Sequence, residues 1–178
     1  MKEIELSKTG KKNKGKLAII DDDVFEEVNK INWSYKKDGY VRGYDRSKKK
    51  EVLLHRFIWE LKYGKIPKGK IIDHKDGNKQ NCQIDNLRLA THSENTCNSK
   101  CPKNNTSGYK GISKYISNKK SEWRKEKWFA SITKNYKTYV KLFPYTDEGL
   151  EEAIKWRERK AKELHKEFSI YNRLDKNK

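Results

Sequence analysis

A polar bend between two short apolar segments limits what this chain can fold into more than any other feature. Residues 70–72 (Lys-Ile-Ile) predict a strand that ends at Asp73 and His74. Residues 75–78 (Lys-Asp-Gly-Asn) then supply the bend, because Asp, Gly and Asn favour turns. A second short strand is predicted over 87–90. The stretch therefore predicts a bent hairpin with several polar side chains at the end of its first strand.

A short helix is expected directly after the second strand. Thr91 and Glu94 have the spacing of a capping box, in which two side chains satisfy backbone donors at the start of a helix. The helix should therefore begin at His92. Asn95 would lie one turn into this helix, where its side chain can point back to Asp73.

Four side chains of this stretch carry chemistry: Asp73, His74, Asn86 and Asn95. Hydrolysis of a phosphodiester needs an activated water, and the neutral imidazole of His74 accepts a proton near pH 7. The oxygens of Asp73 and Asn95 are hard ligands, which favour Mg²⁺ or Mn²⁺ over zinc. Asn86 could hold either the His74 ring or the backbone of the bend. These residues predict a site for one divalent cation beside one water.

The D-H-x-D-G-N … N-L-R-x-x-T-x-x-x-N pattern resembles the HNH endonuclease motif of phage-type homing endonucleases, in its His-Asn-Asn variant. The resemblance covers roughly residues 50–100. It implies a ββα-metal fold with a single divalent metal, in which His74 is the general base and Asn86 orients the site. It also implies Asp73 and Asn95 as the metal ligands, and Asn95 stands where the name motif has its second His.

Other polar residues near the motif have less specific expectations. His92 is expected to face solvent, with a role as a substitute ligand as the alternative. His55 lies in a helix predicted over 54–61 and is expected to pack, or to make a hydrogen bond, behind the site, with a phosphate or active-site contact as the alternative. Positive charges suited to phosphate contacts, with ordinary solvated charges as the alternative, are Arg56, Lys75 and Lys79.

A second resemblance covers about residues 105–172. Strands are predicted over 127–133 and 137–143, followed by a helix over 148–168 with one apolar stripe. The segments S-G-Y-K-G-I-S, W-F-A-S-I, F-P-Y-T-D-E-G-L-E-E-A and K-E-L-H-K-E-F are similar to the Apetala-two/ethylene-response-factor-type DNA-binding domain. That family lays a three-stranded sheet in the DNA major groove.

Alternation along the strands predicts which side chains face the groove. Inward positions are expected at Trp128, Ala130 and Ile132, and also at Val140 and Leu142. The resemblance then implies groove-facing sites at Lys110, Ser113, Tyr115, Ser131, Thr133, Lys137, Tyr139 and Lys141. The plant domains have several Arg at these sites. Because Lys cannot make the bidentate guanine contact of Arg, looser base specificity is expected.

Composition limits the size of any hydrophobic core. Of 178 residues, 33% are hydrophobic and 38% are charged, so about two or three small modules are expected rather than one large core. Five Trp, ten Tyr and five Phe argue against disorder. We predict an α+β chain that begins with a β-rich module (residues 1–53) and a nuclease core (54–100). A linker (101–107) then leads to a DNA-binding domain of three antiparallel strands on one helix (108–172), and a tail (173–178) follows. The first module is expected either to support the nuclease core or to face DNA.

The charge distribution predicts the partner. The formal net charge is +18, and residues 101–178 hold 20 Lys and Arg against 10 Asp and Glu. A basic excess interleaved with aromatic residues is typical of nucleic-acid binding, so double-stranded DNA is the expected partner of a monomeric chain. No apolar run is long enough to span or lie in a bilayer, so no membrane role is expected.

The cysteines predict the compartment. Cys82, Cys97 and Cys101 are an odd set with no signal peptide ahead of them, which predicts reduced thiols in a cytoplasm, that of the host cell if the gene belongs to a phage. A zinc site started by Cys97 and Cys101 is a weaker alternative.

Taken together, the two resemblances predict a metal-dependent DNA endonuclease of the homing type that uses Mg²⁺ or Mn²⁺. The alternative is a non-cleaving, sequence-specific DNA-binding regulator built on a nuclease fold. The complete set of Asp73, His74, Asn86 and Asn95 favours the enzyme.

Overall fold

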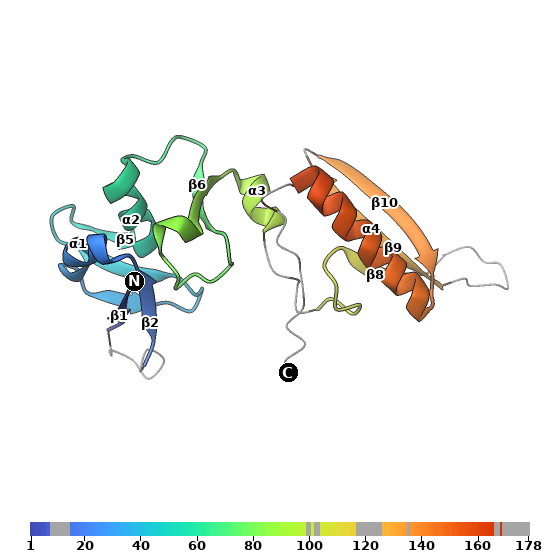
Figure 1. Cartoon of the computed structure of the whole chain (residues 1–178), viewed down its shortest axis with the longest axis horizontal. Helices are drawn as coiled ribbons and strands as arrows, with labels where there is room; N and C mark the ends of the chain where they lie inside the picture. Colours follow the sequence, from blue (N-terminus) through green and yellow to red (C-terminus); the bar gives the residue numbers. More distant parts are fainter. Residues whose placement is uncertain are drawn as a thin grey trace. The chain divides into compact units, whose positions relative to one another are not determined.

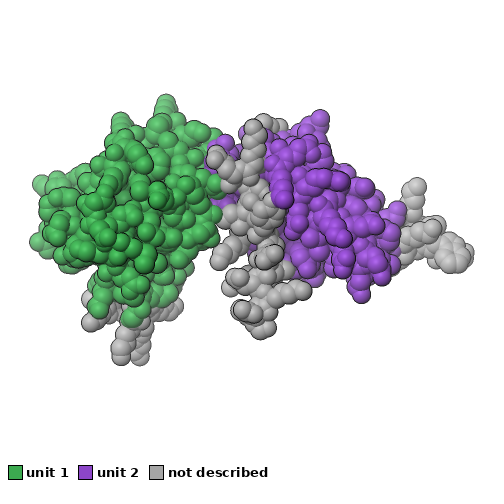
Figure 2. Space-filling model, viewed as in Figure 1, with its two compact units in different colours: residues 1–92 green, residues 93–178 purple. Residues whose placement is uncertain are grey.

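The computed structural model describes residues 1–7, 15–98, 101, 104–116, 126–134, 136–165 and 168. The chain divides into two compact units, Met1–His92 and Ser93–Lys178 (Figure 2). The predicted tail over 173–178 and part of the predicted linker over 101–107 lie outside the described residues. None of the described helices is both long and apolar enough to cross a membrane.

Unit 1 consists of short strands and helices (Figure 1). Its described residues form three small sheets, in which β1 pairs with β2, β4 lies between β3 and β5, and β6 pairs with β7, all antiparallel. The elements in chain order are β1 (Lys2–Glu5), β2 (Leu17–Ile20), the 3-10 helix η1 (Asp22–Val24), α1 (Phe25–Asn29), β3 (Trp33–Tyr35), β4 (Val41–Asp45), β5 (Lys50–Leu53), α2 (Leu54–Tyr63), β6 (Ile71–His74), the 3-10 helix η2 (Ile84–Asn86) and β7 (Leu87–Ala90).

One hydrophobic core joins all parts of unit 1. Its buried members come from the N-terminal strands, such as Ile20, and equally from the later segments, such as Ile58 and Leu87. Residues 1–53 and 54–92 therefore share a core, and the boundary predicted after residue 53 does not separate two modules. A segment of about 50 residues buries a smaller share of its surface than a larger unit does, so one shared core stabilises both segments.

The N-terminal segment also makes hydrogen bonds to residues 80–84, which precede β7. The backbone N–H of Ile19 donates to the carbonyl of Gln80 (2.9 Å), and Cys82 N–H donates to the carbonyl of Ile19 (2.8 Å). The Asp21 carboxylate accepts a hydrogen bond from Ile84 N–H (2.7 Å). Of the two roles left open for residues 1–53, these contacts correspond to support of the segment that follows.

Unit 2 is a three-stranded antiparallel sheet with a helix on one face (Figure 1). The strand order is β10–β9–β8, and Ala153, Trp156 and Ala161 of the helix pack against the sheet. The elements are α3 (His92–Cys97), β8 (Ile112–Ile116), β9 (Glu126–Lys134), β10 (Lys137–Pro144) and α4 (Asp147–His165). Helix α3 begins at His92, as predicted from the capping box.

The sheet faces agree with the prediction in β9 but not in β10. Ala130 and Ile132 are buried on the helix side, as expected. In β10, however, Phe143 is buried, whereas Val140 and Leu142 are 55% and 43% exposed. The register pairs Phe143 with Trp128, so these two side chains share the helix side of the sheet.

The prediction that Lys137, Tyr139 and Lys141 face outward is therefore wrong. Tyr139 packs against the core beneath the helix, and its ring lies 5.7 Å from the Nζ atom of Lys160 in α4. Alternation divides a strand into two sets but does not say which set is inside. Here the two aromatic rings of β10 bury more apolar surface than Val140 and Leu142 would, and this decides the orientation.

Candidate functional site

Asp73 and His74 are the last two residues of β6, and both are buried, with 5% and 4% of their surface exposed. The chain reverses directly after them, because the N–H of Gly77 donates to the carbonyl of His74 (3.0 Å). Gly77 has a φ of +70°, a conformation that glycine adopts without a steric penalty. The bend predicted over 75–78 is therefore present at the end of the strand.

Asn86 holds this bend through its side-chain amide. Its Oδ1 accepts a hydrogen bond from the N–H of Asp76 (3.1 Å), and its Nδ2 donates to Asp76 Oδ1 (3.0 Å) and to the carbonyl of Asn81 (2.8 Å). Asn81 Nδ2 donates to the other oxygen of Asp76 (2.9 Å). Of the two roles predicted for Asn86, its side-chain contacts match the one that fixes the backbone of the bend. Asp76, which the sequence analysis did not single out, is the centre of this network.

Replacing Asn86 with alanine removes both of its hydrogen bonds to Asp76. We expect the free energy of unfolding to fall by about 1–3 kcal/mol, since Asp76 N–H and Asn81 C=O lose their partner. Denaturant unfolding measures this effect. Asn29→Ala, at an exposed helix end, is the control, and an Asn86→Ala variant as stable as the wild type would contradict the role of Asn86 in holding the bend.

Asp73 forms a buried ion pair across the hairpin. It lies opposite Arg88 in the register, and Arg88 Nε and Nη2 donate to Asp73 Oδ2 at 3.0 and 2.8 Å. The two side chains are only 6% and 10% exposed. Two charge-assisted hydrogen bonds to one oxygen fix the orientation of the carboxylate. Arg88 was also missed from the sequence, although its place opposite Asp73 follows from the hairpin once the register is known.

The chemistry of Asp73 fits a hard divalent cation. A carboxylate is a preferred ligand of Mg²⁺ and Mn²⁺. Asn95, the second predicted ligand, lies in α3 within the residues assigned to unit 2. All three cysteines are free thiols, and the described residues include no group of three or more His, Cys, Asp and Glu side chains that could hold a metal.

His74 is buried beside two other rings and a thiol. Its ring is 4.9 Å from that of His55 and 6.3 Å from that of Tyr40, measured between centroids, and its Nε2 is 3.9 Å from Cys82 Sγ. Burial lowers the pKa of His74 to about 4, although the nearby Asp76 and Asp73 act in the opposite direction. The imidazole is therefore neutral at pH 7, which is the form that accepts a proton from water.

His55 packs behind His74, one of the arrangements expected for it. It is 4% exposed, and its ring also lies 5.3 Å from that of Tyr40. Burial lowers the pKa of His55 to about 3, and the charge of His74 adds to this effect. Within the described part of the chain, its Nδ1 is buried without a hydrogen-bond partner. Tyr40 and Cys82 complete this packing and had no signal in the sequence, because their contacts are long-range.

The predicted phosphate-binding residues of unit 1 differ in their surroundings. Arg56 is exposed on α2. Lys75 is exposed, and its Nζ donates to the carbonyl of Asp85 (2.6 Å). Lys79 Nζ donates to the carbonyl of Asp38 (2.7 Å) and lies 4.0 Å from the ring centroid of Tyr40. Lys79 is therefore directed into its own unit, beside the aromatic residues around His74.

In unit 2, some of the predicted groove-facing residues lie on the outer face of the sheet, whereas Lys110 lies before the first strand. Ser113 and Tyr115 are exposed on β8, and Ser131 and Thr133 lie on the same outer face of β9. Lys110 precedes the sheet and is half-buried, and its Nζ donates to the carbonyls of Thr96 (3.1 Å) and Cys97 (2.9 Å). In this structure the ammonium group of Lys110 therefore binds the end of α3.

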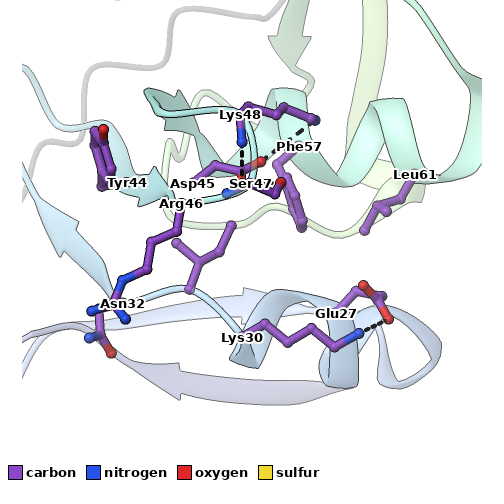
Figure 3. A pocket seen from close by; sticks show the side chains of 11 residues that line it. Glu27, Lys30, Asn32, Tyr44, Asp45, Arg46, Ser47, Lys48, Phe57 and Leu61 are labelled. Atoms are coloured by element: carbon purple, nitrogen blue, oxygen red, sulfur yellow. Dashed lines mark hydrogen bonds and ion pairs between the residues drawn. The ribbon is translucent and has the colours of Figure 1, made fainter.

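A separate cavity of about 590 Å³ lies on unit 1 (Figure 3). It is lined by residues of α1, the β4–β5 turn and α2, among them Lys48, Phe57 and Leu61. Asp73, His74 and Asn86 are not among its lining residues. Phe57 packs against the core of unit 1, whereas Leu61 is 43% exposed at this cavity.

The fold and the site together define a class of nuclease. A small hairpin presents a neutral histidine beside a fixed carboxylate at a strand end, and the model of a family described as HNH endonuclease matches residues 52–97, which include this hairpin. The chain belongs to the HNH endonuclease family.

Two viral proteins are similar to this chain. The uncharacterized HNH endonuclease L560 of Acanthamoeba polyphaga mimivirus is 36% identical over 166 residues, which cover 92% of this chain and 79% of that protein. Protein 3.8 of Escherichia phage T7 is 41% identical over 119 residues, which cover 66% of this chain and 88% of that protein. No solved structure matches the chain.

Proposed function

We propose that this protein is a metal-dependent DNA endonuclease of the homing type, which hydrolyses phosphodiester bonds in double-stranded DNA. The observation that carries the proposal is the pair of Asp73 and His74 at the end of β6, inside the segment matched by the HNH family. His74 is neutral at pH 7 because it is buried, and Asp73 is oriented by Arg88. A general base beside a fixed carboxylate is the equipment that phosphodiester hydrolysis requires.

In the proposed reaction, His74 accepts a proton from a water molecule as the water oxygen attacks the phosphorus. The bond between phosphorus and the 3′-oxygen breaks, which leaves a 5′-phosphate and a 3′-hydroxyl once the leaving oxygen is protonated by solvent. Asp73 and Asn95 would hold Mg²⁺ or Mn²⁺, which supplies positive charge to the phosphate and to the leaving oxygen. Asn86 keeps the bend, and thereby His74, in position.

We also propose that unit 2 helps to choose the DNA site, as an Apetala-two/ethylene-response-factor-type domain. Its basic excess, 20 Lys and Arg against 10 Asp and Glu over residues 101–178, supports attraction to DNA. Ser113, Tyr115, Ser131 and Thr133 would face the major groove from the outer side of the sheet. Arg56 and Lys75 of unit 1 would contact phosphates.

A cleavage assay tests the enzymatic proposal. Its two substrates are supercoiled plasmid DNA and the DNA of a phage that encodes a close relative. We expect nicked or linear products with Mg²⁺ or Mn²⁺ and none with EDTA, because Asp73 and Asn95 act only through the cation. The His74→Ala protein, prepared in parallel, controls for contaminating nucleases. If the wild type binds DNA but cuts none of these substrates with either metal, the chain is instead a non-cleaving DNA-binding regulator.

A further inference from the structure

The outer face of the unit 2 sheet is formed by side chains that the cross-strand register places in rows. Tyr115 pairs with Lys127, which pairs with Pro144, and Ser113 pairs with Phe129, which pairs with Leu142. The remaining rows are Ser131 with Val140 and Thr133 with Thr138. Helix α4 covers the opposite face, so this face is the one that unit 2 presents outward.

This outer face is apolar and hydroxylic. Tyr115, Val140 and Leu142 are 44%, 55% and 43% exposed, and the rings of Tyr115 and Phe129 lie 6.4 Å apart. The hydroxyls of Thr133 and Thr138 are 2.9 Å apart. Among the described positions of this face there is no arginine, and its single lysine, Lys127, lies in the row at one end.

The positive charge of unit 2 favours DNA as the partner of this face. The exposed Lys137 and Lys141 lie on β10, the edge strand, on the side opposite the outer face. Their Nζ atoms lie near the rings of Tyr139 and Phe143, at 5.3 and 5.1 Å from the centroids. The positive charge of these lysines on the edge strand attracts the phosphates of DNA to this sheet. An apolar protein partner would not explain the net positive charge of this part of the chain.

The apolar and hydroxyl side chains of the outer face then favour thymine over guanine. A guanine is read best by the two donors of an arginine, and the described positions of this face hold none. A thymine presents its C5-methyl group in the major groove, where apolar side chains contact it, and hydroxyl side chains can bond to any base. Val140 and Leu142 are the exposed apolar side chains of one strand, and Phe129 lies beside Leu142.

We infer that the outer face of unit 2 recognises thymine methyl groups in the major groove, with Val140 and Leu142 as the residues that determine this preference. The inference rests on the proposed function and specifies which DNA the domain prefers. Side chains two residues apart on a strand are about 6.8 Å apart, and base pairs rise by about 3.4 Å. A strand that follows the groove would therefore place the two contacts about two base-pair steps apart.

Replacing thymine by uracil tests the inference, since it removes only the methyl group. Random-sequence duplexes are selected for binding to the full chain in EDTA, and the enriched sequence is synthesised with thymine and with uracil. We expect the uracil form to bind about tenfold more weakly, which corresponds to the loss of two buried methyl contacts. Competition binding assays measure the ratio of the two dissociation constants.

Protein variants show whether this face is responsible. The double variant Val140→Ala, Leu142→Ala should bring the thymine-to-uracil ratio close to one, mainly by weakening binding to the thymine form. Both side chains are exposed, so the fold should be retained. Ile116→Ala is the matched control, because Ile116 is 46% exposed but alternates with Tyr115 and so belongs to the other face of β8. Its ratio should equal that of the wild type.

The outcomes separate the inference from the function on which it rests. Equal binding of both DNA forms, an enriched sequence without thymine, or an unchanged ratio in the double variant would overturn the inference while DNA binding stands. If the chain binds no duplex at all, the proposed targeting role of unit 2 fails, and the inference fails with it.

Discussion

Replacing His74 with alanine should lower the rate of DNA cleavage by about 10²- to 10⁴-fold, the usual contribution of a general base. The neighbouring His55 cannot take over its task, because it is buried behind His74 with a pKa of about 3. DNA binding in EDTA should persist, since unit 2 and the exposed basic residues are unchanged. Cleavage rates with saturating metal and binding constants without metal measure the two properties separately.

Two controls make this result specific. His165→Ala changes a histidine of α4 in unit 2 and should cleave at the wild-type rate. Thermal unfolding of His74→Ala shows whether the buried site has kept its fold, because alanine leaves a cavity beside His55. A folded His74→Ala protein that cleaves normally would refute the role of His74 as the base. A folded variant that loses DNA binding would show that His74 acts on binding instead.

The second large effect concerns stability in acid. The pKa of His55 is about 3 in the folded protein, against 6.5 for an ordinary histidine, because the side chain is buried. Between these values the unfolded chain binds a proton that the folded chain does not, so acid favours unfolding. The free energy of unfolding should therefore fall by about 1.4 kcal/mol per pH unit below about pH 6.5 through His55 alone. By pH 4.5 this loss is about 3 kcal/mol.

His55→Phe isolates this contribution. The ring is kept, the proton-binding group is lost, and no unpaired buried Nδ1 remains, so the variant should be at least as stable as the wild type near pH 5. Urea unfolding from pH 4.5 to 7.5 should give a shallower pH dependence, by about one proton, than for the wild type. Titration of carboxylates is common to both proteins and cancels in the comparison. Parallel pH curves for the two proteins would contradict the assignment.

Local features of this chain were readable from its residues because they depend on neighbours in sequence. The bend after His74 follows from Asp76 and Gly77, and the start of α3 at His92 follows from the capping box. Asp73, His74 and Asn86 could be singled out for the same reason, since the motif that carries them spans only a hairpin. The helix side of β9 was also predicted correctly from alternation.

Other features depended on which distant segments meet, and these could be known only from the folded chain. The pairing of Asp73 with Arg88 needs the register of the hairpin, and the packing of Tyr40, His55 and Cys82 around His74 needs three separate segments to converge. Alternation in β10 has two solutions, and only the packing against α4 chose the one that buries Phe143 and exposes Val140. Short-range preferences are encoded by adjacent residues, whereas burial is a property of the whole core, and so a strand can reveal its two faces without revealing which of them lies inside.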